Sequence, residues 1–128
     1  MLQKQAKFIV AAAVLTFACA CTSSAKTYRS EVNITKATGV SGGGVDVRGN
    51  VRSARKCKKS RRVKVYHDVD PAGPSSMDFF LGSTVTNKRG KWRLSTELEP
   101  DKVRALVVGK RKGRHKCKPA RSETVPVT

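Results

Sequence analysis

Two cysteines, each set in a run of cations, are the residues of this chain whose type and spacing are chemically informative. Cys57 lies in RSARKCKKSRR, residues 52–62, and Cys117 lies in KRKGRHKCK, residues 110–118. Neither has the Cys-x-x-Cys or Cys-x-x-His spacing of metal and redox sites, and a zinc site would need more ligands than His115 supplies. Together with the export signal described below, this predicts a Cys57–Cys117 disulfide, with a metal or redox pair as the alternative.

Together with the nearby Lys64 and Arg121, the two basic runs contain 15 of the 27 lysines and arginines, and no acidic residue interrupts either run. A disulfide would bring these mutually repelling segments to one end of the molecule. Closing a loop of about 60 residues stabilises a fold by roughly 4 kcal/mol, which is enough to hold them together. Their repulsion is also partly screened, because the Debye length is about 8 Å at physiological salt.

Such a cluster of cations predicts a site for an anionic polymer or an anionic membrane or cell-wall surface, with binding that weakens as salt rises. The alternative is that the cations are solvated loops that keep the protein soluble. The predicted polyanion-binding residues are Arg55, Lys56, Lys58, Lys59, Arg61, Arg62, Lys110, Arg111, Lys112, Arg114, Lys116 and Lys118.

The first 25 residues have the pattern of a signal peptide. Lys4 and Lys7 precede an apolar run, FIVAAAVLTFACA, residues 8–20, and small residues at 18–20 and 23–25 suit cleavage. The run is shorter than the roughly 20 apolar residues of a transmembrane helix. The sequence therefore predicts a secreted protein with no transmembrane span in the mature chain. Lipid anchoring through Cys19 or Cys21 is the alternative.

The mature chain carries about seven short segments with strand character and no segment of helical period. Val45, Val47 and Val51 alternate with polar residues, and Val63 and Val65 do the same after the first basic run. Residues 102–109 form the most apolar segment, which predicts a central strand. Turn signals between these segments favour an all-β sandwich, and aromatics are only 5% of the chain, so aliphatic residues must fill the core.

Two further features concern the organisation of the strands. The Gly-rich stretch at 39–44 predicts a break between an N-terminal segment, 26–44, with an edge strand, and the sandwich domain at 45–128. The β-rich runs 79–86 and 91–95 flank the turn Asn87–Gly90, which predicts a hairpin with Gly90 at positive φ. Trp92 alternates with charged neighbours, so we expect it in the core.

The order of these motifs resembles small secreted bacterial β-sandwich domains of the transthyretin-like and carboxypeptidase-regulatory-like group. The resemblance covers residues 45–128 and depends on a G-x-V strand at 49–51, the segment from Leu81 through Gly90-Lys-Trp, a late apolar strand and the cysteine pair. It implies an immunoglobulin-like or prealbumin-like sandwich, usually without enzymatic activity. The residues that serve ligand binding or hydrolysis in that group have no counterpart here.

No constellation for catalysis is visible in the sequence. There is no Gly-x-Ser-x-Gly motif, carboxylate pair or phosphate loop, and adjacent residues such as His67 and Asp68 point to opposite faces of a strand. Asp68 and Asp70 are better explained as turn formers than as calcium ligands. We therefore predict no catalytic residue, metal or cofactor. The basic runs lack aromatics for base stacking, so sequence-specific nucleic-acid binding is not expected.

The sequence thus predicts a secreted, disulfide-linked, all-β module that binds an anionic envelope or extracellular polymer. One alternative is a structural secreted domain without a specific ligand. The other, disfavoured for want of a nucleophile, is a small secreted hydrolase or effector.

Overall fold

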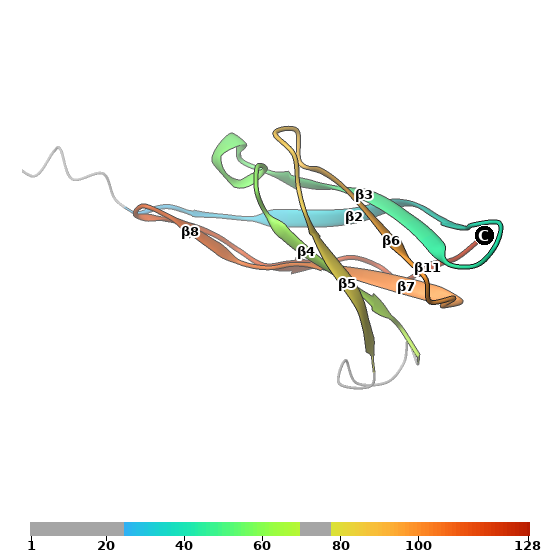
Figure 1. Ribbon diagram of the computed structural model, residues 1–128. Coiled ribbons are helices and arrows are strands. Elements are labelled where there is room, and N and C mark those ends of the chain that lie inside the picture. The colour runs from blue at the N-terminus through green and yellow to red at the C-terminus, as the bar shows by residue number, and fades with distance from the viewer. Residues whose placement is uncertain (1–24, 70–77) are drawn as a thin grey trace, which may run out of the picture.

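The computed structural model describes residues 25–69 and 78–128. These residues form an all-β fold with one short 3₁₀ turn, Arg55–Cys57, and no α-helix (Figure 1). The predicted all-β class is confirmed. The signal-peptide segment, the candidate lipid-anchor residues Cys19 and Cys21, and Asp70 lie outside the described residues.

One of the two main sheets has three antiparallel strands in the order β2-β3-β6. Its members are β2 (Ser30–Gly39), β3 (Val45–Ser53) and β6 (Lys91–Thr96). β2 and β3 are joined by the Gly-rich stretch, which is a hairpin turn with Gly42, Gly43 and Gly44 all at positive φ. The boundary expected at residue 45 therefore falls inside a hairpin, and β2 belongs to the sandwich.

The other main sheet has the order β10-β7-β4-β5, and β11 also pairs with β7. Its strands are β4 (Arg62–His67), β5 (Phe79–Val85), β7 (Lys102–Val107), β10 (Ala120–Arg121) and β11 (Val125–Pro126). β7 lies between β4 and the two C-terminal strands, as its apolar sequence predicts. Each strand that the sequence analysis located has a counterpart in the two sheets, namely β2, β3, β4, β5, β6 and β7.

The core is the layer of side chains between these sheets. Alternate residues of β3, β4 and β7 point inward, and Val47, Val63, Val65 and Val107 are completely buried. Trp92 on β6 is 4% exposed and belongs to the same cluster, as predicted. Since aliphatic side chains dominate the cluster, the packing fits the low aromatic content of the chain.

The expected hairpin between 79–86 and 91–95 is wrong. β5 pairs with β4 and β6 pairs with β3, so the two strands lie in different sheets. The turn Asn87–Gly90 joins the layers instead, and Gly90 has the predicted positive φ of 80°. The turn is fixed by backbone hydrogen bonds, one of which runs from the Val51 amide to the Gly90 carbonyl at 2.7 Å.

A third, small sheet extends from one end of the sandwich. Its strands are β1 (Thr27–Tyr28), β8 (Lys110–Lys112) and β9 (His115–Cys117), in the order β1-β9-β8. The second basic run is therefore a hairpin and not a loop, with β1 added in parallel to β9. β8 lies at the left-hand end of the molecule in Figure 1.

Candidate polyanion-binding pole

A disulfide joins the two basic runs, as the sequence predicts. Cys57 ends the short 3₁₀ turn and Cys117 ends β9, and their Cα atoms are 5.7 Å apart. Both cysteines are buried, at 0% and 2% exposure. The bond spans 60 residues of sequence, so it strongly limits the freedom of the unfolded chain.

Arg61 forms a second connection between the same segments. It is completely buried, and its Nη1 donates to the Cys57 carbonyl at 2.8 Å and to Ser30 Oγ at 2.9 Å. Its Nη2 donates to the carbonyls of Val108 and Lys118, both at 3.0 Å. One guanidinium thus bonds both the carbonyl of Cys57 and the carbonyl of Lys118, the residue after Cys117.

This buried guanidinium corrects the predicted set of ligand-binding residues. Burial disfavours the charged form and lowers the pKa of Arg61, yet no acidic side chain among the described residues pairs with it. Four hydrogen bonds to oxygen compensate part of its lost hydration. With every atom inside the molecule, Arg61 positions the basic segments and is not available to a polymer.

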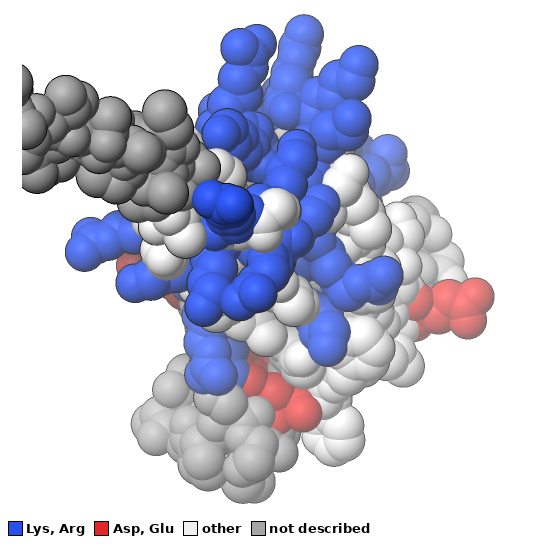
Figure 2. Space-filling view, turned by 90° about the vertical axis from the view of Figure 1, so that its left-hand side faces the viewer, with Lys and Arg blue, Asp and Glu red and all other residues white. Residues whose placement is uncertain are grey.

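The other eleven predicted cations reach the surface at the disulfide-linked end. Lys58 and Lys110 are half-buried. The remaining nine are exposed: Arg55, Lys56, Lys59, Arg62, Arg111, Lys112, Arg114, Lys116 and Lys118. We call these eleven residues the basic pole. Figure 2 views this end of the molecule and shows lysine and arginine side chains spread over it, with few acidic residues at the margins.

Cations lie directly opposite one another within the basic pole. In the β8–β9 hairpin, Arg111 is in register with Lys116. Like charges at such positions destabilise a sheet. Lys110 crosses to the first basic run, where its Nζ donates to the Ser60 carbonyl at 3.2 Å. The fold therefore keeps two cationic segments in contact despite their repulsion.

Four cations in the same region were missed by the sequence analysis. Lys26 and Arg29 flank β1, which pairs with β9 and is further held by the Lys26 amide donating to His115 Nδ1 at 3.4 Å. Lys88 and Arg89 belong to the turn between the sheets, whose Gly90 lies against the Lys58 side chain. Their charge is visible in the sequence, but their position depends on strand pairings that it does not reveal.

A small cavity of about 480 Å³ lies within the basic pole. It is lined by the backbone and side chains around Cys117, with Lys110, Arg111, Lys116 and Lys118 among its residues. These side chains supply four positive charges around one hollow. An anionic group of a polymer would meet several ammonium and guanidinium donors there.

The remaining polar candidates have structural partners. His67 Nε2 lies 2.8 Å from Asp101 Oδ1, and hydrogen bonding to His67 lowers the pKa of Asp101. Asp68 is buried and accepts a hydrogen bond from Thr124 Oγ1. Within residues 25–69 and 78–128, no group of three or more histidine, cysteine or acidic side chains is arranged to hold a metal.

A scan against protein-family models, a search of curated proteins and a search of solved structures each found no match for this chain. No helix in the described part of the chain is long and apolar enough to span a membrane.

Proposed function

We propose that this protein is a secreted, non-enzymatic β-sandwich module that binds an anionic polymer of the cell envelope or extracellular space through its basic pole. The observation that supports this proposal best is the double connection of the two cationic segments. A disulfide and a buried arginine both hold positive charge at one end, against its own repulsion. Binding an anionic polymer would relieve that repulsion and release the polymer's counterions.

Secretion is part of the same proposal. The apolar N-terminal run and the disulfide both fit an oxidising, extracellular setting. The transthyretin-like and carboxypeptidase-regulatory-like resemblance supports a binding or structural role, because such domains are usually non-enzymatic. An immunoglobulin-like arrangement of the strands belongs to this proposal as well.

A salt series with heparin, teichoic acid and duplex DNA tests the role of the basic pole. We expect binding to all three at about 50 mM salt, and a steep loss of affinity as salt rises. Replacing Arg55 and Lys59 by serine should weaken binding roughly tenfold. It should also reduce the slope of log affinity against log salt concentration by about two, one for each lost contact.

The matched control is the double replacement of Lys64 and Lys102, which lie on β4 and β7, by serine. It removes the same charge from outside the basic pole and should leave affinity nearly unchanged. Equal weakening by both variants would show that net charge alone drives binding. Absence of binding to all three polymers would favour a purely structural role.

A further inference from the structure

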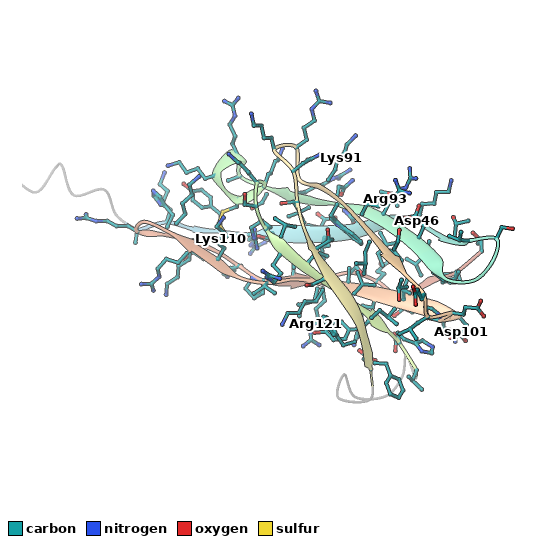
Figure 3. All side chains as sticks on the ribbon, in the orientation of Figure 1. Asp46, Lys91, Arg93, Asp101, Lys110 and Arg121 are labelled. Atoms are coloured by element: carbon teal, nitrogen blue, oxygen red, sulfur yellow. A yellow bond between two sulfur atoms is a disulfide. The ribbon has the colours of Figure 1, made fainter. Side chains whose placement is uncertain are left out.

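A second cationic site lies beside the basic pole, where β3 and β6 meet the end of β5. It is an open groove of about 650 Å³ lined by Thr35, Arg48, Gly49, Asn50, Thr84, Val85, Asn87, Lys91, Trp92 and Arg93. The sheet register sets Arg48 directly opposite Arg93 and Asn50 directly opposite Lys91. In Figure 3, Lys91, Arg93 and Asp46 lie along the upper side of the molecule, apart from Lys110 at its left.

One carboxylate orients the two arginines of this groove. Asp46 Oδ1 accepts from Arg93 Nε at 2.9 Å, and Asp46 Oδ2 accepts from Arg48 Nε at 3.2 Å. Burial works to raise the pKa of Asp46, but its bonds to Arg93 and Arg48 outweigh burial and lower the pKa. Among the described residues, no acceptor receives a hydrogen bond from the Nη1 or Nη2 atom of either arginine. Both guanidinium groups can therefore donate to a ligand through these atoms.

The two asparagines of the groove also present donors, because their side-chain oxygens already accept hydrogen bonds. Asn87 Oδ1 accepts from the amides of Arg89 and Lys91, at 2.9 and 3.0 Å. Asn50 Oδ1 accepts from Asn33 Nδ2 at 3.4 Å. The amide nitrogens of Asn50 and Asn87 are thus left to donate toward a ligand.

Trp92 lies beneath the cations of this groove, between Lys91 and Arg93 on β6. It is 4% exposed and belongs to the core cluster, on the opposite face of the strand from its two charged neighbours. The Cε2 side of its ring lies against Gly49, where a Cβ would be only 2.6 Å from Cε2. The indole therefore supports the strands that carry the charged side chains of the groove and does not itself face a ligand.

The ligand that suits these groups is rich in acceptors and negatively charged. Two arginine forks and a lysine match a sulfate, phosphate or carboxylate, while two amides match ring and hydroxyl oxygens. The volume is within the range of about 300–1,000 Å³ typical of small-ligand sites. Bases fit less well, because stacking needs an exposed ring and the groove's aromatic residue, Trp92, is buried.

We propose that this groove binds an anionic sugar unit, held through its charged group by Arg48, Arg93 and Lys91 and through its ring oxygens by Asn50 and Asn87. The inference goes beyond the basic pole, since the groove binds a single unit whether or not the pole binds a polymer.

Trp92 is the only tryptophan of the chain and lies between Lys91 and Arg93 on β6, so its indole N–H gives one NMR signal that is sensitive to binding at these two residues. The full chain is titrated with a sulfated heparin disaccharide, maltose and inorganic sulfate. We expect a saturable shift of the indole signal with the heparin disaccharide, at least tenfold weaker binding of sulfate, and no shift with maltose. Equal affinity for sulfate and disaccharide would overturn the sugar assignment, and so would a tighter complex with a short single-stranded oligonucleotide.

Variants separate this site from the basic pole. Replacing Arg48 and Arg93 by serine should weaken disaccharide binding at least tenfold, while the Arg55→Ser, Lys59→Ser protein should bind it unchanged. If the double arginine variant unfolds, Asn50→Asp is the second variant, and its added negative charge should abolish binding. Retained binding by Asn50→Asp, or loss of binding on mutation of the pole, would contradict the proposed groove. If the Arg55→Ser, Lys59→Ser protein still bound the polymers fully, the result would contradict the proposed function of the basic pole and leave the groove unaffected.

Discussion

Arg61 illustrates how one side chain positions a charged surface without belonging to it. Its guanidinium is buried and bonds three backbone carbonyls, two of them beside the disulfide. The adjacent Arg62 is exposed, and its Nη1 donates to Ser83 Oγ at 3.3 Å. The same residue type thus has a structural role at one position and a surface role at the next.

Replacing Arg61 by leucine should destabilise the fold by about 2–4 kcal/mol, because one buried carbonyl, two partly buried carbonyls and Ser30 lose their donor. Arg61→Lys should recover only part of this loss, since the single ammonium of lysine cannot donate to all three carbonyls as the planar guanidinium does. Urea unfolding at pH 7 measures the change. Arg62→Leu is the matched control and should shift stability by less than about 0.5 kcal/mol. An equal effect of the two leucine variants would rule out the bridging role.

The inward position of Arg61 was within reach of the sequence. Val63 and Val65 alternate with polar residues, and extending this period of two backward places residue 61 on the inner face. The sequence analysis instead grouped Arg61 with its charged neighbours, because a cation is rarely buried without an acidic partner. The cost of burial is offset by backbone carbonyls, and their arrangement depends on the whole fold.

At the scale of elements, the sequence predicts which segments are strands better than it predicts their partners. Alternation within 79–86 and 91–95 identifies β5 and β6, and Gly90 marks the turn. A four-residue turn between two strands usually makes a hairpin. Here Leu94 of β6 packs against Gly82 of β5 across the core, so the strands face one another from opposite sheets. That choice depends on the pairing of β5 with β4, which directly precedes it, and of β6 with β3, which is distant in sequence.

The β8–β9 hairpin is expected to gain stability if one of its opposed cations is reversed. Lys116→Glu places a carboxylate directly opposite Arg111, which should stabilise the protein by about 0.2–1 kcal/mol at low salt. The same change should weaken polymer binding, because the basic pole loses two units of charge. Urea unfolding and heparin affinity measure the two effects.

Arg114→Glu is the control for this prediction. Arg114 is exposed in the turn after Gly113 and has no residue opposite it in the strand register. The substitution makes the same change of net charge, so it should weaken binding with a smaller gain in stability. If both variants gained equally, general charge repulsion and not the cross-strand pair would explain the stabilisation.

At the scale of the whole molecule, charge is distributed unevenly on a chain of net charge +18. The core cluster between the sheets consists of apolar side chains, whose packing does not depend on charge screening. The basic pole is different, because its two segments are held by the disulfide, by Arg61 and by the Lys110–Ser60 contact against their mutual repulsion. Ionic strength should therefore affect the pole more than the core.

Removing the disulfide tests this balance. Replacing Cys57 and Cys117 by serine should lower stability by about 4 kcal/mol, from the loss of a crosslink that spans 60 residues. The unlinked protein should then gain more stability than the native protein when salt is raised from about 0.05 to 0.5 M, because screening replaces part of the lost restraint. Urea unfolding at several concentrations of NaCl measures how the free energy of unfolding depends on salt in each protein. Parallel salt dependences in the two proteins would mean that the crosslink does not hold the pole against repulsion.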